Sequence, residues 1–202
     1  FSMVTVASDW SGNLSFTATE HLLEDVKPKH SVTSKIKAQK GKHYVTIVMS
    51  DGDNVQWLER GFETDTRWYG NRHRGEFKMN WTIAPTLYDL VPSVLTSIYD
   101  KGTANDTFIA GPSGYGYVNI NEYNEHSIAK YAELTAGYCK KSGLNVINFL
   151  DNYIDTAFLG HFSKYSNIKG GLWSVADKYV SGGDYTAGSV YWSNNKPFVT
   201  FR

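Results

Sequence analysis

Residues 44–58 read YVTIVMSDGDNVQWL, an apolar run that is followed by a short polar turn and then by a helical pattern. The run 44–49 is apolar almost throughout, which is typical of a parallel strand that is covered on both faces. After the turn, Val55, Leu58 and Phe62 recur at the spacing of one helix face. A buried strand, a short turn and an amphipathic helix together form the repeating unit of an α/β fold.

The alternation of apolar runs and helical stretches continues on both sides of this unit. Further strands are predicted at 3–8, 77–85, 107–113, 145–151, 168–175, 189–193 and 197–202. Helices are predicted at about 53–62, 89–101, 123–141 and 157–162. We expect a (β/α) barrel of the TIM type or part of one, with an open doubly wound parallel sheet as the alternative.

The chain is interpreted as one domain that covers residues 1–202 and is excerpted from a longer protein, because both ends of the sequence resemble strands. The most polar stretch, 24–42, is expected to be a surface excursion that touches a neighbouring domain.

The composition limits the classes of partner. Lys+Arg and Asp+Glu are both 20, so the formal net charge is zero, which argues against a nucleic acid or an acidic membrane held by bulk charge. No segment is apolar enough to span a bilayer. The 14 Tyr, 10 Phe and 6 Trp suit a sugar-binding cleft as well as a core, because an aromatic ring stacks on the C–H face of a pyranose. The single Cys139 shares a helical face with Ile128 and Ala132 and is expected to be a buried thiol.

Both candidate folds place functional groups at the carboxyl ends of their strands, and polar and aromatic side chains gather there in this sequence. They are Asp9, Trp10, Asp51, Asp53, Asn54, Trp81, Ser113, Tyr115, Asp151, Asn152, Trp173 and Arg202. The opposite ends carry ordinary surface residues such as Lys42, Glu76 and Lys169. This asymmetry is the strongest functional signal in the sequence.

The aspartates at these positions have structural as well as chemical interpretations. Asp53 precedes Gln56 by three residues, which resembles a capping box, so Asp53 is expected to cap the following helix. Asp51 lies before that cap and is favoured as the carboxylate available for chemistry, against the alternative of a plain turn aspartate. Asp151 has the same two interpretations, because Asn152 and Asp155 compete with it as caps of the next helix.

Other kinds of site lack their motifs. Val55, Gln56 and Phe62 stand where an EF-hand loop needs positions five, six and twelve. Asn119 stands where a dinucleotide fingerprint needs its third glycine, the histidines lack H-x-x-x-H spacing, and no G-x-S-x-G elbow occurs. No cofactor and no metal ion are therefore indicated. The carboxylates and aromatic side chains that remain are the groups that glycoside hydrolysis and glycan binding use.

Several blocks of the sequence stand in a characteristic order: ASDWSGNLS (7–15), VMSDGDNVQWL (48–58), MNWTIAPTLYDLVPSVL (79–95), FIAGPSGYGYV (108–118) and FVTFR (198–202). In that order they resemble the C-terminal domain of the GxGYxYP glycoside hydrolase family, although Val118 replaces the proline of the motif that names it. The resemblance implies a TIM-barrel-like domain that is preceded by another domain, and a sugar-processing role. We expect a secreted, periplasmic or cell-surface protein.

The sequence thus predicts a glycoside hydrolase that acts on a glycan, with Asp51 and Asp151 as acid and as nucleophile or base, in either order. The other strand-end residues are predicted to bind substrate, with an aromatic platform of Trp81, Tyr115 and Trp173, orienting groups Asp53 and Asn54, and a polar contact from Arg202. One alternative is a non-catalytic carbohydrate-binding or scaffolding domain, favoured by the lack of a strand-end glutamate. The other is a metal-dependent deacetylase or esterase, which the histidine spacing disfavours.

Overall fold

The fold is built on one seven-stranded sheet. The computed structural model describes residues 6–8, 10–20, 26–30, 37, 39–151, 153–175 and 188–201. The strands are β1 (Val48–Met49), β2 (Met79–Ile83), β3 (Asp106–Ala110), β4 (Val146–Asp151), β5 (Gly170–Val175), β6 (Val190–Ser193) and β7 (Lys196–Phe201), in the spatial order β1-β2-β3-β4-β5-β7-β6. All neighbouring pairs are parallel except β6 and β7. The predicted α/β class is confirmed.

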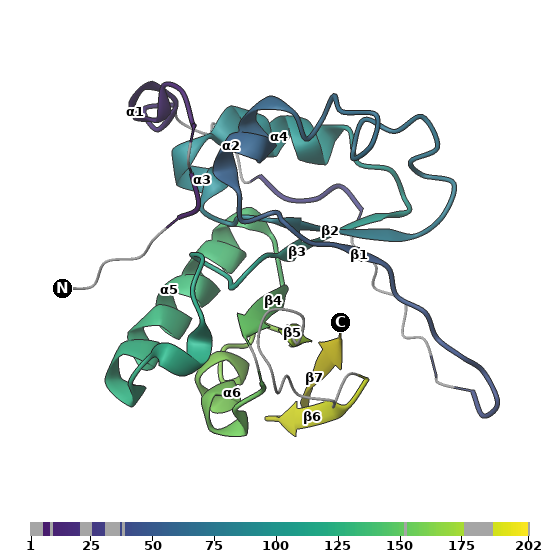
Figure 1. Ribbon diagram of the computed structural model, residues 1–202, viewed down its shortest axis with the longest axis vertical. Helices are drawn as coiled ribbons and strands as arrows, with labels where there is room; N and C mark the ends of the chain where they lie inside the picture. The colour runs from purple at the N-terminus through teal and green to yellow at the C-terminus, as the bar shows by residue number, and fades with distance from the viewer. Residues whose placement is uncertain are drawn as a thin grey trace.

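The helices cover the outer side of this sheet. They are α1 (Leu14–Thr17), α2 (Val55–Arg60), α3 (Leu87–Leu90), α4 (Pro92–Asp100), the 3₁₀ turn η1 (Ile120–Glu122), α5 (Glu125–Ser142) and α6 (Thr156–Ser163). In Figure 1, α2, α3 and α4 lie over β1, β2 and β3, whereas α5 and α6 lie beside the strands from β4 onward. No helix in the described part of the chain is both long and apolar enough to cross a membrane.

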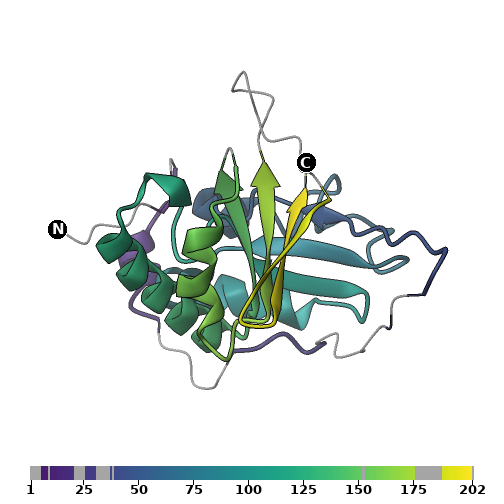
Figure 2. The same cartoon turned by 90° about the horizontal axis from the view of Figure 1, so that it is seen from below.

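The sheet curls without closing. β2 and β3 pair over five residues, but β3 and β4 are in register only at Ala110 and Ile147. At this weak junction the sheet turns, so that β4, β5 and β7 run in a clearly different direction from β2 and β3 in Figure 2. Among the described residues, β1 and β6 remain edge strands, which gives half of a barrel rather than a closed one. An open wound sheet, the alternative from the sequence, is compatible with this order.

The core lies between the sheet and the helices and is rich in aromatic rings. The Trp81 ring on β2 meets the rings of Phe62 and Tyr69 edge-on at 5.7 and 5.2 Å between centroids. Phe149 on β4 meets Phe162 of α6 at 4.8 Å and stacks on Trp173 of β5, also at 4.8 Å. Rings from the strands therefore face the helical layer, and this packing fixes which side of each strand is buried.

Two further details of the interior match the sequence patterns. Val55, Leu58 and Phe62 are at most 1% exposed, as the helical spacing predicted. Cys139 is fully buried in α5, and this burial raises the pKa of its thiol to about 12. The thiol is therefore protonated at ordinary pH and behaves as a small apolar group.

The first two predicted strands need correction. Residues 6–8, the described part of the stretch 3–8, are not in the sheet; instead the carbonyl of Ala7 accepts the N–H of Val55 at 2.9 Å. The run 44–49 is strand only at 48–49. Val45, which precedes β1, is 85% exposed, and among the described residues β1 has a neighbouring strand on one side only. An apolar run by itself did not distinguish a central strand from an edge.

The last two strands form a hairpin, which accounts for the antiparallel pair. Asn194 and Asn195 connect them and have φ angles of 49° and 59°. Two successive left-handed residues make the tight turn whose twist matches that of a hairpin, and asparagine tolerates this conformation better than most residues. β6 therefore folds back along β7 at the edge of the sheet.

Candidate active site

The turn after β1 is held tightly against β2. The backbone N–H of Gly52 donates to Oγ1 of Thr82 at 2.8 Å, and the Thr82 hydroxyl donates to the carbonyl of Met49 at 2.9 Å. A Cβ at position 52 would lie 1.8 Å from the Thr82 carbonyl oxygen, so only glycine fits. Asp51, with a left-handed φ of 83°, is left exposed at the carboxyl end of the sheet.

Asn54, and not Asp53, caps α2. The Asn54 side-chain oxygen accepts the backbone N–H of Trp57 at 3.3 Å, and Asn54 occupies the N-cap position. The expected capping box of Asp53 and Gln56 was therefore wrong by one residue. A cap needs extended backbone and an acceptor that reaches the third residue of the helix, and Asn54 meets both conditions.

Replacing the true cap is expected to weaken the domain, whereas replacing its neighbour is not. Asn54→Ala should lower the free energy of unfolding by about 0.5–2 kcal/mol, because the N–H of Trp57 loses its acceptor. Urea denaturation at pH 5 of this variant and of Asp53→Asn provides the comparison. A loss of stability for Asp53→Asn with none for Asn54→Ala would restore the original assignment of the cap.

Asp53 is the carboxyl with the most distinctive environment. Its residue is only 9% exposed. The pKa of Asp53 is raised to about 6, chiefly by burial; the hydrogen bond of its own backbone N–H opposes this shift, and the charge of Asp51 contributes to it. Two carboxyls at one turn thus differ in burial, and one of them is protonated below about pH 6.

Tyr117 belongs to the same group of side chains. Burial raises the pKa of the Tyr117 hydroxyl, and the charges of Asp53 and Asp51 raise it as well. A charge effect of this kind requires proximity, so Tyr117 lies near both aspartates although more than 60 residues separate it from them in sequence. Its residue is 45% exposed, so it borders solvent. Tyr117 is not among the residues predicted from the sequence, although it stands within the GYGYV stretch that carries the family resemblance.

The glycine-rich loop 111–118 brings Tyr117 to this position. Tyr131 of α5 fastens the loop: its hydroxyl lies 3.1 Å from the carbonyl of Ser113 and 2.7 Å from that of Gly116, and it accepts the N–H of Gly116 at 3.0 Å. The Ser113 hydroxyl donates to the carbonyl of Val118 at 2.8 Å and accepts the N–H of Leu150 at 3.0 Å. Ser113 is fully buried, so its hydroxyl ties the loop to β4 rather than facing a cleft.

Asp151 ends β4 and is 5% exposed. Its Oδ2 accepts the backbone N–H of Asn121 at 2.8 Å, while Asp155 caps α6 through a 2.8 Å bond from Ala157. Asp151 is therefore free of the capping role. Two strands separate β1 from β4, so the backbones near Asp51 and Asp151 would be about 14 Å apart on a flat sheet.

The aromatic residues expected to form a sugar platform lie elsewhere. Trp81 is 4% exposed and its ring N–H donates to Asp106 at 2.8 Å, whereas Trp173 is 0% exposed in the core. Tyr115 stacks on Tyr138 of α5 at 5.1 Å. The rings of Trp81 and Trp173 face the helices because alternate residues of each strand point to the helical layer. Trp10, in contrast, is 77% exposed.

Three of the predicted site residues, Asp9, Asn152 and Arg202, lie outside the described residues. Within the described ranges, no three His, Cys, Asp or Glu side chains lie close enough together to hold a metal ion. The arrangement that the structure does bring together is Asp51, Asp53 and Tyr117, at the carboxyl end of the sheet.

Comparisons with known proteins identify a family and a structural relative. Residues 41–202 match the family model described as "GxGYxYP putative glycoside hydrolase C-terminal domain". The chain also resembles the crystal structure of a putative hydrolase from Bacteroides thetaiotaomicron VPI-5482, with 28% sequence identity and a TM-score of 0.80. The similarity covers 94% of this chain and 36% of that one, so the chain spans about a third of the length of its structural relative. A search of the curated proteins found no match.

Proposed function

Because this chain belongs to the GxGYxYP family and matches the model of its C-terminal domain, we propose that it is a glycoside hydrolase whose site lies at the carboxyl ends of its parallel strands. The observation that carries the proposal is Asp53, a buried carboxyl with its pKa raised to about 6 and a second carboxylate, Asp51, nearby in the same turn. Glycoside hydrolysis requires two carboxyl groups in different protonation states.

In the proposed reaction, Asp53 is the general acid. Its proton passes to the glycosidic oxygen as the bond between that oxygen and the anomeric carbon breaks, and the electron pair of the bond leaves with the oxygen. Burial suits Asp53 to this role, because it keeps the carboxyl protonated in a range where an ordinary aspartate has lost its proton.

The second carboxylate stabilises the positive charge that develops on the sugar. Asp51 is the first candidate because it acts electrostatically on Asp53, and Asp151 at the end of β4 is the second. If this second carboxylate is a nucleophile, it would lie about 5–5.5 Å from the acid. If it is a base that activates water, it would lie about 6.5–9.5 Å from the acid. Tyr117 is proposed to donate a hydrogen bond to the carboxylate or to a sugar hydroxyl, and Trp10 to stack on a sugar ring.

The proposal is tested by hydrolysis of aryl glycosides and of a panel of plant and host glycans between pH 4 and pH 8. We expect release of reducing ends with a rate that falls above about pH 6, because Asp53 must carry its proton. Binding of a glycan without cleavage at any pH would instead identify a non-catalytic carbohydrate-binding domain. If the domain neither binds nor cleaves any glycan of the panel, both functions are excluded for it.

A further inference from the structure

A pocket lies away from the candidate active site, between α2 and α4. Its volume is about 230 Å³, and its lining residues are Leu58, Glu59, Arg60, Glu63, Thr64, Ser93, Val94 and Ser97. The lining comes from the C-terminal end of α2, the turn that follows it and the first half of α4. The site at Asp53 lies at the opposite end of α2, so the two places are separate.

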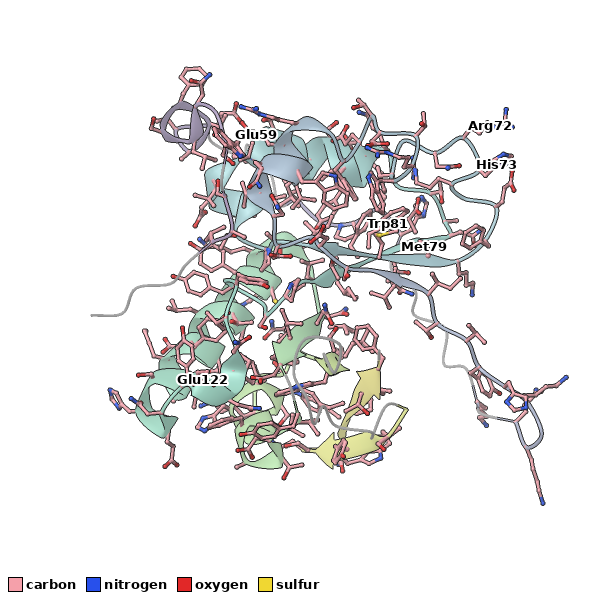
Figure 3. All side chains as sticks on the ribbon, in the orientation of Figure 1. Glu59, Arg72, His73, Met79, Trp81 and Glu122 are labelled. Carbon is pink, nitrogen blue, oxygen red and sulfur yellow. The ribbon has the colours of Figure 1, made fainter. Side chains whose placement is uncertain are left out.

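Glu59 contributes an enclosed polar atom to this pocket. Its Oε2 atom accepts no hydrogen bond from the residues that the structure describes. Figure 3 shows Glu59 in the helical layer above the sheet. The neighbouring Glu63 differs, because its Oε2 accepts the Ser97 hydroxyl at 2.9 Å and also binds Lys101. An enclosed carboxylate oxygen without a donor is costly, so a donor from outside the protein would be stabilised there.

We propose that this pocket binds a small ligand through a protonated amine that donates to Glu59. An ammonium group supplies both the hydrogen bond and the opposite charge, and such charge-assisted bonds are about twice as strong as neutral ones. The hydroxyls of Thr64 and Ser93 can accept the remaining N–H groups. Lys101 does not compete for Glu59, since it is bound to Glu63.

The volume and the floor of the pocket limit the rest of the ligand. Drug-sized ligands occupy sites of about 300–1,000 Å³, so a pocket of about 230 Å³ suits a single ring or a short chain. Leu58 and Val94 provide apolar surface for the carbon skeleton. A six-membered amino sugar and a short alkylamine both satisfy these limits.

The test compares amines with their neutral counterparts. Chemical shifts of the backbone amides are followed by NMR during titration with D-glucosamine, D-glucose, n-butylamine and n-butanol near pH 7. We expect saturable shifts at Ser93 and Ser97 with at least one amine, and at least tenfold weaker binding of its neutral counterpart. Equal binding of amine and neutral compound, or no shift with either amine, would overturn the proposal.

Variants locate the binding at Glu59. Glu59→Gln keeps the shape and removes the charge, so amine affinity should fall at least tenfold, while Glu133→Gln on the exposed face of α5 should leave it unchanged. Glu59→Gln should not lower the Tm, because the enclosed carboxylate oxygen has no hydrogen-bond partner to lose among the described residues. Ser93→Leu, which fills the pocket without altering Glu59, should abolish binding independently. Retained amine affinity in either pocket variant would contradict the proposal.

Discussion

Asp53→Asn is expected to reduce hydrolysis by a factor of about 10²–10⁴, the usual contribution of a general acid. The amide has nearly the same shape as the carboxyl but cannot give a proton to the leaving oxygen. The rate that remains should lose the fall above about pH 6, since that fall reports the ionisation of Asp53. Initial rates on the best substrate of the glycan panel, measured from pH 4 to pH 8, check both expectations.

The same substitution should stabilise the fold at neutral pH. Burial raises the pKa of Asp53 to about 6, so the folded protein resists the loss of this proton more than the unfolded chain does. The favourable contribution of Asp53 is complete below the unfolded pKa near 3.8 and is lost as the pH rises through about 6. Asp53→Asn avoids this loss, and we expect a gain of about 1–2 kcal/mol at pH 7.5 and none near pH 4.

Asp51→Asn is the matched control for the stability measurements, because the exposed Asp51 should change stability little at either pH. Loss of activity together with a gain in stability is the signature of a buried catalytic carboxyl. If Asp53→Asn retains full activity and an unchanged pH profile, Asp53 is not the acid, and Asp51 with Asp151 becomes the pair to examine.

Trp173→Ala is expected to lower the free energy of unfolding by about 3–5 kcal/mol, the usual cost of removing a large core aromatic side chain. Trp173 is 0% exposed and stacks on Phe149 at 4.8 Å, so its removal leaves a cavity at the centre of the packing on β4 and β5. Denaturant unfolding at constant pH, with the slope of the transition compared between variants, measures this loss.

Trp192→Ala removes the same side chain from β6, where it is 68% exposed, and should change stability by no more than about 0.5 kcal/mol. The pair of variants also decides between the two interpretations of Trp173. A Trp173→Ala protein that keeps its stability and loses only glycan affinity would show that this ring is a sugar platform and not part of the core.

Local sequence patterns predicted most of the helices and strands. Pro92 occupies the first turn of α4, and the chain turns at Gly102 after Asp100. The apolar spacing of α2 predicted its buried face, and the strands from β2 onward lie within a few residues of their predicted positions. Such signals succeed because caps, helical spacing and apolar runs act between residues close in sequence.

The assignment of Asp51 and Asp53 shows where local patterns failed. Both aspartates can cap a helix or end a strand, and nothing within six residues distinguishes them. Their difference arises from burial. Asp53 is 9% exposed, whereas the hydrogen bond between the Gly52 N–H and the Thr82 hydroxyl holds the turn so that Asp51 is exposed. Burial is a property of the packed chain, and the pKa of a carboxyl depends on it.

The sequence by itself determined the α/β class, the order of strands and helices from β2 onward, and the end of the sheet at which Asp51 and Asp53 lie. These follow from local preferences and from the rule that parallel strands place their carboxyl ends together. Only the tertiary structure decided that the sheet curls into half a barrel, that Trp81 and Trp173 face the helices, and that Tyr117 joins the aspartates. Those outcomes depend on contacts between residues far apart in sequence, whose register and facing are fixed when the sheet and helices pack together.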